Sequence, residues 1–509
     1  MTTTATAAKL PPQIPYIIGN EGCERFSFYG MRNILTVFLM TSLLAAVPED
    51  LRKAEAKEVF HTFVIGVYFF PLLGGWLADR FFGKYPTIFW FSVVYCAGHA
   101  CLAVFDHSIR GFYFGLFLIS LGSGGIKPLV SSFVGDQFDK SNRSLAQKVY
   151  DAFYWIINFG SFFASLLMLL VLKAWGASVA FGLPGVLMLV ATLILWSGRR
   201  KYVNQPAQGA NPHSFLKVVL TALKAGGAGA AVAVAGLIGA GLSLSQIGGL
   251  GLVPAVCLAL VLVMGFGGLG AALQLDRARR VHPDDAVDGA RSVLRLLVLF
   301  ALVTPFWSLF DQKASTWVLQ ADQMAKPAWF QSSMMQALNP ALVMILIPFN
   351  NLVLYPLLRR LGLQVTALRR MGAGIALAGA AWIVAGLLQL WLDEGSSVTI
   401  LWQMLPYALL TLGEVLVSAT GLEFAYSQAP LAMKGTINSF WSLSVTVGNL
   451  WVLLSNVSVK SPAALQAIKS SGYSETAVLM FFFAGFALVA AALFGLAARR
   501  YPMQDNYRP

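Results

Sequence analysis

Long apolar stretches, each separated from the next by a short polar connection, run through the whole chain. A transmembrane helix needs about 20 apolar residues, and about fourteen stretches reach that length. They cover residues 15–44, 58–79, 84–105, 111–132, 147–173, 178–198, 215–241, 250–274, 291–320, 333–359, 371–392, 398–427, 434–457 and 475–500. Strand-like alternation of apolar and polar residues is absent. The pattern therefore predicts an all-α membrane protein with 14 transmembrane helices.

The stretches differ in how many polar residues they carry. Residues 215–274, two stretches joined by a glycine-rich connection, are almost free of polar side chains, whereas most others carry polar residues at mid-depth. A purely apolar span can lie in lipid, but a polar face must turn toward protein or water. We expect a major-facilitator fold, with six-helix bundles at 1–200 and 291–509 and an inserted transmembrane hairpin in the linker 201–290.

The first stretch contains a charged motif, EGCERFSFYG, at residues 21–30. At 100° per residue, Glu21, Arg25, Tyr29 and Arg32 share one helix face, with Glu24 at its edge. A charge at the bilayer centre costs about 2.5–3.5 kcal/mol on insertion scales. Glu21, Glu24 and Arg25 could form a salt bridge with a purely structural role. Arg32 would then be a second cation without a partner in the motif. We therefore expect the face to line a polar path visited by an anion.

Composition agrees with a membrane protein, and the charge distribution predicts its orientation. The 509 residues are 57% hydrophobic and only 12% charged, with a net charge of +13. Lys and Arg gather in alternate connections, as the positive-inside rule requires, so both termini are expected to be cytoplasmic. A basic stripe with interleaved aromatics is absent, which argues against a nucleic-acid partner.

The four cysteines indicate no covalent or metal site. Cys23, Cys96, Cys101 and Cys257 all lie inside apolar stretches without paired spacing. We expect no disulfide, metal or other cofactor. The first dozen residues do not resemble a cleaved signal, so the first span is expected to act as the targeting element.

Further polar residues mark the first half of the chain. His61 and Tyr68 lie seven residues apart on one side of the second span, although a histidine near a helix end is often only interfacial. Lys127 follows a glycine run and precedes a proline, where its ammonium cannot easily reach the membrane surface. In the fifth span, one face carries Tyr150, Tyr154 and Asn158. This face could equally well line a binding site or pack against another helix.

Carboxylates mark the second half. Trp307 precedes Asp311 by one turn, and Lys313 lies about 200° away from Asp311, where we expect another partner or solvent. Glu414 stands alone in an apolar helix, which favours a functional role. The remaining candidates are Ser418 on the face of Glu414, Asn339 at an irregular point before Pro340, and Trp441, which fits core packing equally well.

Together these residues predict a dipolar cavity. Arg25, Arg32 and Lys127 are cations of the first half, whereas Asp311 and Glu414 are carboxylates of the second. Such a cavity suits a small zwitterion, because a buried charge without its partner is strongly unfavourable. Carboxylates beside cations can also exchange protons. The residues alone therefore indicate a proton-coupled transporter of a small zwitterion.

Several segments resemble a known family. The motif at 21–30 is similar to the ExxERFxYYG signature of proton-coupled oligopeptide transporters, and GGWLADRFFGKY at 74–85 resembles the signature loop of the major-facilitator superfamily, in which Asp and basic residues pair across the cytoplasmic gate. GSGGIKP, FWSLFDQ and GEVLVSATGLEFAYSQAPLAMKG also match. The resemblance covers nearly the whole chain and implies proton-driven uptake of di- and tripeptides by alternating access, without enzymatic activity.

The resemblance also implies roles for individual residues. The peptide carboxylate would be received by Arg25, Arg32 and Lys127, and the amino terminus by Asn158, Asn339 and Glu414. Side-chain pockets would be shaped by Tyr29, Tyr68, Trp307 and Trp441. Proton coupling is implied for Glu21, Glu24, His61, Asp311 and Glu414, with Asp311 pairing with Arg32.

Three residues depart from the family pattern. Phe28 replaces a tyrosine, Asp311 is shorter than the usual glutamate, and Lys313 stands where glutamine is usual. The extra hairpin is similar to that of bacterial members, and the extracellular domain of animal members is missing. We therefore expect a bacterial inner-membrane protein that works as a monomer in the lipid bilayer.

Two other functions fit parts of the pattern. Some relatives in plants carry nitrate or other small solutes, so a symporter of an anion or an amino acid is the nearest alternative. A proton/drug antiporter is a more distant one, since it does not need a dipolar cavity. A receptor or an enzyme fits least, because the chain shows no nucleophile–base pair, nucleotide loop or metal cluster.

Overall fold

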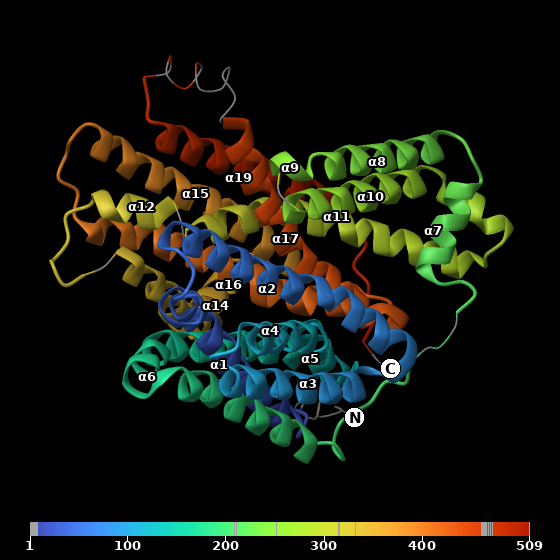
Figure 1. Cartoon of the computed structure of the whole chain (residues 1–509). Helices are drawn as coiled ribbons and strands as arrows, with labels where there is room; N and C mark the ends of the chain where they lie inside the picture. Colours follow the sequence, from blue (N-terminus) through green and yellow to red (C-terminus); the bar gives the residue numbers. More distant parts are fainter. Residues whose placement is uncertain are drawn as a thin grey trace.

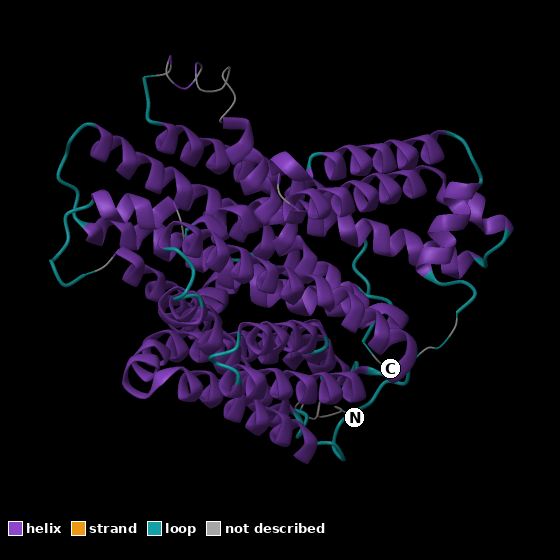
Figure 2. Cartoon of the chain, in the orientation of Figure 1, coloured by secondary structure: helices purple, strands orange, loops and turns teal. Residues whose placement is uncertain are grey.

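The computed structural model describes residues 9–507, apart from 208, 210, 251, 314–315, 331, 460–465, 467, 469 and 471. Helices make up most of the described chain, and an isolated bridge between Ala325 and Thr399 is the β-structure recorded there (Figure 2). Eleven helices of the described part are long and apolar enough to cross a membrane. The predicted all-helical membrane protein is thereby confirmed.

The first part of the chain, here called the N-terminal half, contains six helices. They are α1 (Ile14–Phe38), α2 (Glu49–Leu77), α3 (Lys84–Val104), α4 (Ile109–Gly124), α5 (Lys127–Asp136) and α6 (Ala146–Ser197). The predicted span 111–132 is divided between α4 and α5. α6 bends at Gly176, whose φ of 78° is open to glycine without strain, so it contains both predicted spans 147–173 and 178–198.

The middle of the chain differs from expectation. Its helices are α7 (Phe215–Lys224), α8 (Ala228–Ser245), α9 (Ile247–Leu250) and α10 (Leu252–Gln274). The predicted single span 215–241 is wrong, because Gly226 and Gly227 have φ of 73° and 96° and end the helix there. α8 packs along α10, and α7 packs against the start of α11 (Figure 1).

The last part, here called the C-terminal half, begins with α11 (Asp284–Gln312). It continues with α12 (Thr316–Gln323), α13 (Leu338–Phe349), α14 (Tyr355–Arg360), α15 (Ala367–Asp393), α16 (Met404–Gln428), α17 (Lys434–Val459) and α19 (Glu475–Arg499). The predicted span 291–320 is likewise divided, between α11 and α12. α15 packs between α16 and α19, while α11 packs against α17.

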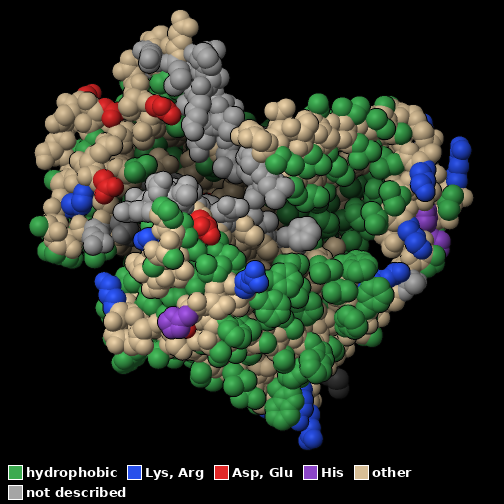
Figure 3. Space-filling view, in the orientation of Figure 1, with side chains coloured by type: hydrophobic (Ala, Val, Ile, Leu, Met, Phe, Trp, Pro, Cys, Tyr) green, Lys and Arg blue, Asp and Glu red, His purple; other side chains and the backbone are tan. Residues whose placement is uncertain are grey.

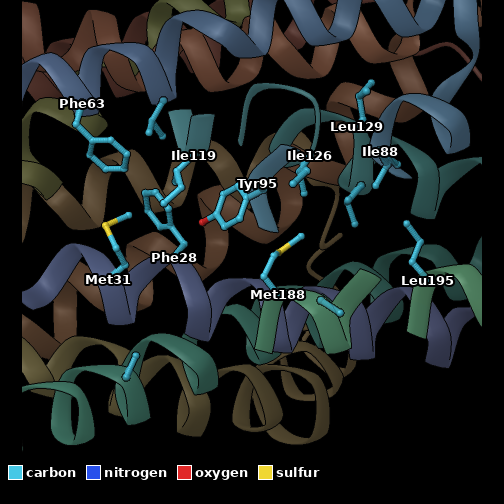
Figure 4. Close-up of a cluster of buried hydrophobic side chains, with 14 of the residues drawn as sticks. Phe28, Met31, Phe63, Ile88, Tyr95, Ile119, Ile126, Leu129, Met188 and Leu195 are labelled. Atoms are coloured by element: carbon cyan, nitrogen blue, oxygen red, sulfur yellow. The ribbon is translucent and has the colours of Figure 1, made fainter. Parts of the chain in front are cut away.

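Each half has its own hydrophobic core. One cluster of buried side chains lies mainly in residues 14–202, where α1 packs along α6, and also takes in Tyr426 and Tyr507 of the C-terminal half; Figure 4 shows part of it. A second cluster runs from Val293 to Phe494 in the C-terminal half. Hydrophobic side chains also cover much of the surface shown in Figure 3, as expected where lipid is the solvent. The space between the two cores is where polar residues of both halves meet.

At one end the halves are joined by polar contacts. The carboxylate of Asp79 accepts the backbone N–H groups of Gly435 at 3.1 Å and Thr436 at 2.7 Å, which caps the start of α17. Asp136 forms an ion pair with Lys84 at 2.7 Å and accepts the hydroxyl of Tyr426 from the other half at 2.8 Å. Asp79, from the 74–85 loop, thus joins the halves through a helix start, whereas Lys84 pairs within its own half.

The C-terminal tail lies across the same end. Asn506 donates its backbone N–H to Ser427, Tyr507 donates its hydroxyl to Glu423, and Asp505 forms an ion pair with Arg143 of the N-terminal half. This end carries the positively charged connections, so the structure is closed on the side that the sequence assigns to the cytoplasm.

Candidate functional site

The motif of α1 forms a three-membered ion cluster. The Nε atom of Arg25 lies 2.7 Å from Oε1 of Glu21 and 2.6 Å from Oε2 of Glu24. All three residues are buried. Two carboxylates around one guanidinium leave a net negative charge, which is unfavourable in a low-dielectric site. The cluster is therefore suited to hold a proton or to share its charge with the cations nearby.

The other cations of this half lie on aromatic rings. The ammonium of Lys127 is 3.5 Å from the ring centre of Phe28 and 5.7 Å from that of Tyr68. The guanidinium of Arg32 is 5.8 Å from the ring centre of Phe60. Aromatic faces attract cations without neutralising their charge. Lys127 and Arg32 thus remain able to receive an anion, and the ring of Phe28 supports Lys127.

A glycine run places Lys127 where it is. A Cβ atom on Gly124 would lie 2.5 Å from the backbone of Phe70, and one on Gly125 would lie 2.2 Å from the ring of Phe91. The backbone between α4 and α5 therefore packs directly on α2 and α3. Lys127 begins α5 at this point, deep between the helices.

Across the gap, Glu414 is held by neutral donors. Its two oxygens accept hydrogen bonds from the hydroxyl of Tyr154 and from the amide of Asn339, both at 2.5 Å. Asn339 also donates to Thr411 at 3.0 Å. Tyr154 belongs to α6 of the N-terminal half, so this carboxylate is bound from both halves. It is buried and has no cation within ion-pair distance among the described residues.

Asp311 and Lys313 add two charges to the same wall. Asp311 accepts a hydrogen bond from Asn449 at 2.6 Å. Asp311 and Arg32 interact electrostatically, but the described residues show no direct ion pair between them, which differs from the pairing implied by the resemblance. Lys313 is buried against the ring of Phe310 and interacts with both Glu414 and Asp311. Lys313 is thus buried rather than in solvent, and Glu414 is a partner other than Asp311, as one of the two expectations for this residue allowed.

Large aromatic side chains close the C-terminal wall. The rings of Trp307 and Trp441 lie 6.1 Å apart in an edge-to-face arrangement. A Cβ atom on Gly421 would lie 2.1 Å from the ring of Trp441, so that ring lies directly on the backbone of α16. A Cβ atom on Gly448 would lie 2.5 Å from the Cβ atom of Trp307, so α17 packs against the base of that side chain.

The remaining predicted site residues are Tyr29, Asn158, Ser418 and His61. Tyr29 interacts electrostatically with Arg25 and Arg32, and Asn158 donates its amide to the carbonyl of Tyr154 at 2.9 Å. Ser418 is buried in α16 one turn after Glu414. The side chain of His61 lies outside the described residues.

Sequence reasoning left two site residues unassigned. Tyr154 and Tyr150 were equivalent in the pattern, but Tyr150 donates to the carbonyl of Ser131 within its own half, while Tyr154 reaches Glu414. The sequence marked Lys313 as an unusual cation close to Asp311. Helical spacing, however, puts the two side chains on different faces of the helix.

The chain matches the model of a known protein family over residues 85–471, described as the POT family. Among curated proteins, Peptide transporter 3 of Caenorhabditis elegans is 32% identical over 402 residues, covering 75% of this chain and 51% of the relative. Solute carrier family 15 member 2 of Rattus norvegicus is 31% identical over 401 residues, covering 74% of this chain and 49% of the relative. The chain thus spans about half the length of these relatives.

Among solved structures, the in meso crystal structure of the POT family transporter PepTSo is similar over 98% of this chain and 100% of its own. The sequences are 68% identical, and the TM-score is 0.81. The similarity includes both halves and the residues between them.

Proposed function

The chain belongs to the POT family, and we propose that it takes up di- and tripeptides together with protons. The peptide carboxylate would lie against Arg25, Arg32 and Lys127, and the ammonium against Glu414. One observation carries the proposal: uncompensated cations face carboxylates across the gap between the halves. A zwitterion satisfies both walls at once, whereas an anion or a cation alone leaves one wall without a partner.

Proton coupling is supported by carboxylates that share one cation or have none within ion-pair distance among the described residues. Glu21 and Glu24 share one guanidinium, and Glu414 is held by neutral donors. A proton on such a carboxylate removes an uncompensated buried charge, and a peptide ammonium at Glu414 does the same. The arrival of a proton and of a peptide would thus release the contacts that join the halves, which is the basis of alternating access. His61 is included in this proposal by family resemblance alone.

The arrangement in the membrane is part of the proposal. We assign six-helix bundles to residues 1–200 and 291–509, with an inserted transmembrane hairpin in 201–290, which makes 14 spans. The separate cores of the two halves and the pairing of α8 with α10 support this division. The protein would lie in a bacterial inner membrane as a monomer, with both termini in the cytoplasm.

A symporter of another small solute is the second candidate. The cations of the N-terminal wall would suit nitrate or the carboxylate of an amino acid. Glu414 separates the candidates, since an inorganic anion gives this carboxylate nothing to bind.

Uptake into liposomes tests the proposal. The purified protein is reconstituted, and entry of labelled dialanine is followed with and without an inward proton gradient. We expect the gradient to increase uptake and unlabelled di- and tripeptides to compete, while nitrate and free alanine do not. Uptake that ignores the gradient would refute proton coupling, and competition by nitrate alone would favour the second candidate. Outward movement of the substrate driven by the gradient would indicate an antiporter.

A further inference from the structure

A second polar stripe lies behind the ion cluster, inside the N-terminal half. On α1, Asn20 and Ser27 flank Glu24 at positions i−4 and i+3, on a face turned away from Arg32. On α3, polar side chains recur with the same helical spacing. All of these side chains are fully buried, with 0% exposure: Asn20, Glu24, Ser27, Ser92, Tyr95 and His99. The interior of a membrane bundle is otherwise apolar, so two matching polar stripes need a reason.

The two stripes meet at Ser27. Its hydroxyl lies 3.1 Å from Nε2 of His99, within hydrogen-bond distance. The ring of Tyr95 packs on the ring of His99, with 5.1 Å between their centres. The hydroxyl of Tyr95 lies beside Ser27, and it interacts electrostatically with Glu24 and Arg25. Figure 4 shows this oxygen directed toward Phe28 of α1.

Close packing holds these side chains in place. A Cβ atom on Gly185 would lie 2.9 Å from the Cβ atom of His99, so α6 packs directly against the base of that side chain. A Cβ atom on Gly122 would lie 2.7 Å from the Cβ atom of Tyr95, so α4 does the same on the other side. α4 and α6 thus fix the positions from which the two side chains leave α3.

Several polar atoms of the two stripes have no hydrogen-bond partner among the described residues. They include Oε1 of Glu24, the hydroxyl oxygen of Tyr95 and Oγ of Ser92. Buried polar atoms are nearly always paired. The hydroxyl of Tyr95 is thus a buried donor that interacts electrostatically with a carboxylate whose outer oxygen lacks a donor.

The charged groups around Glu24 come from several helices. Glu21 and Arg25 lie on α1, and Lys127 lies at the start of α5. On α3, Tyr95 interacts electrostatically with Glu24. His99, also on α3, lies near the backbone carbonyl of Phe181 in α6. The cavity side of Glu24 is therefore cationic, and its inner side is built from hydroxyl and imidazole groups.

We propose that Tyr95, Ser27 and His99 are positioning residues for Glu24, forming a buried hydroxyl relay on the side away from the cavity. When Glu24 is charged, the hydroxyl of Tyr95 donates to it. When Glu24 carries a proton, the same hydroxyl turns to Ser27, whose proton is then directed to His99. No proton leaves Tyr95 in this exchange. The inference rests on the proposed function, because it concerns how Glu24 takes up and releases the driving proton.

Tyr95→Phe tests the relay, since it removes a single oxygen and keeps the ring. Proton-driven dialanine uptake is measured against external pH, together with counterflow, the exchange of labelled for unlabelled peptide without net proton movement. We expect the pH of half-maximal uptake to move by about 0.5–1 unit, the equivalent of one hydrogen bond. Counterflow should stay within about twofold of wild type, because the peptide site is untouched.

Further variants separate positioning from packing. Tyr202→Phe removes a buried hydroxyl that donates to the carbonyl of Leu195 in the same half, and its pH profile should match wild type. His99→Gln keeps a partner for Ser27 and should also match, while His99→Leu should shift the profile as Tyr95→Phe does.

Three outcomes would overturn the relay. A Tyr95→Phe profile that overlays wild type excludes its hydroxyl, and equal profiles for His99→Gln and His99→Leu exclude the imidazole. A parallel loss of uptake and counterflow without a pH shift assigns both residues to packing. Absence of proton-driven uptake in wild type itself would instead refute the proposed function on which the relay rests.

Discussion

The two walls of the site handle buried charge differently. On the N-terminal wall, Arg25 is neutralised by two carboxylates of its own helix, and Lys127 lies on an aromatic ring. On the C-terminal wall, Glu414 is held by a tyrosine and an asparagine, which satisfy its hydrogen bonds but leave its charge. The motif carboxylates of the first wall are thus in direct ion pairs with Arg25, whereas Glu414 of the second has no cation within ion-pair distance among the described residues and interacts with Lys313 at longer range.

This difference assigns different tasks to the walls. A carboxylate held by neutral donors can accept either a proton or an ammonium group without breaking an ion pair first. A carboxylate already bound to arginine must lose part of that ion pair when it is protonated, which changes the geometry of α1. Protonation of Glu414 therefore needs no ion pair to break, whereas protonation of Glu21 or Glu24 weakens the ion pair with Arg25. Three variants test this contrast.

Glu414→Gln should have the largest effect. The amide keeps both hydrogen bonds but removes the negative charge that binds the peptide ammonium. Removing one partner of a buried charge pair costs about 2–5 kcal/mol, so dialanine uptake should fall at least about thirtyfold. Glu423→Gln is the matched control, because Glu423 lies in the same helix and accepts its hydrogen bond from Tyr507 outside the site. Unchanged transport by Glu414→Gln would remove that residue from the site.

Lys127→Met should have the next largest effect. The substitution keeps the apolar stem on the ring of Phe28 but removes the cation offered to the peptide carboxylate. A hydrogen bond to a charged group is worth about 1.5–3 kcal/mol, so the KM for dialanine should rise about tenfold or more. Lys173→Met, on an exposed part of α6, should leave KM unchanged. Equal KM values for the two variants would contradict a cationic N-terminal wall.

Tyr154→Phe should have the smallest effect of the three. It removes one hydrogen bond to Glu414, worth about 0.5–1.5 kcal/mol, and should slow uptake about two- to tenfold. Tyr150→Phe removes the hydroxyl one turn earlier, which donates within its own half, and should leave transport near wild type. If both variants transport equally, the contact between Tyr154 and Glu414 does not contribute to the cycle.

Residue type and helical spacing were sufficient for much of this site. Glu21, Arg25 and Arg32 could be recognised because charges in an apolar span are costly wherever they face lipid. The same reasoning selected Lys127 and Glu414 as single ions in apolar helices. The structure places Lys127 on the rings of Phe28 and Tyr68 and Glu414 in contact with both halves. The stripe of Ser92, Tyr95 and His99 gave a similar signal in the third span, but without charges it did not stand out.

Residue type and helical spacing could not show which residues of the two halves contact each other. Tyr150 and Tyr154 have the same spacing, and only the position of α16 relative to α6 decides which of them meets Glu414. The spacing also left open whether Lys313 reaches solvent or another partner, and only the packing of α11 near α16 brings it close to Glu414. Likewise Asp79 caps α17, more than 350 residues away, rather than pairing with a basic side chain.

The sequence by itself determined the solvent of this protein, its helical class and the identity of its buried charges. Those follow from hydropathy and the cost of ions in lipid, which act on each segment separately. The tertiary structure decided which charges are paired with an opposite charge of the same helix and which are held only by neutral hydrogen-bond donors. That distinction depends on distances between helices far apart in the chain, because ion pairs and hydrogen bonds act only at short range.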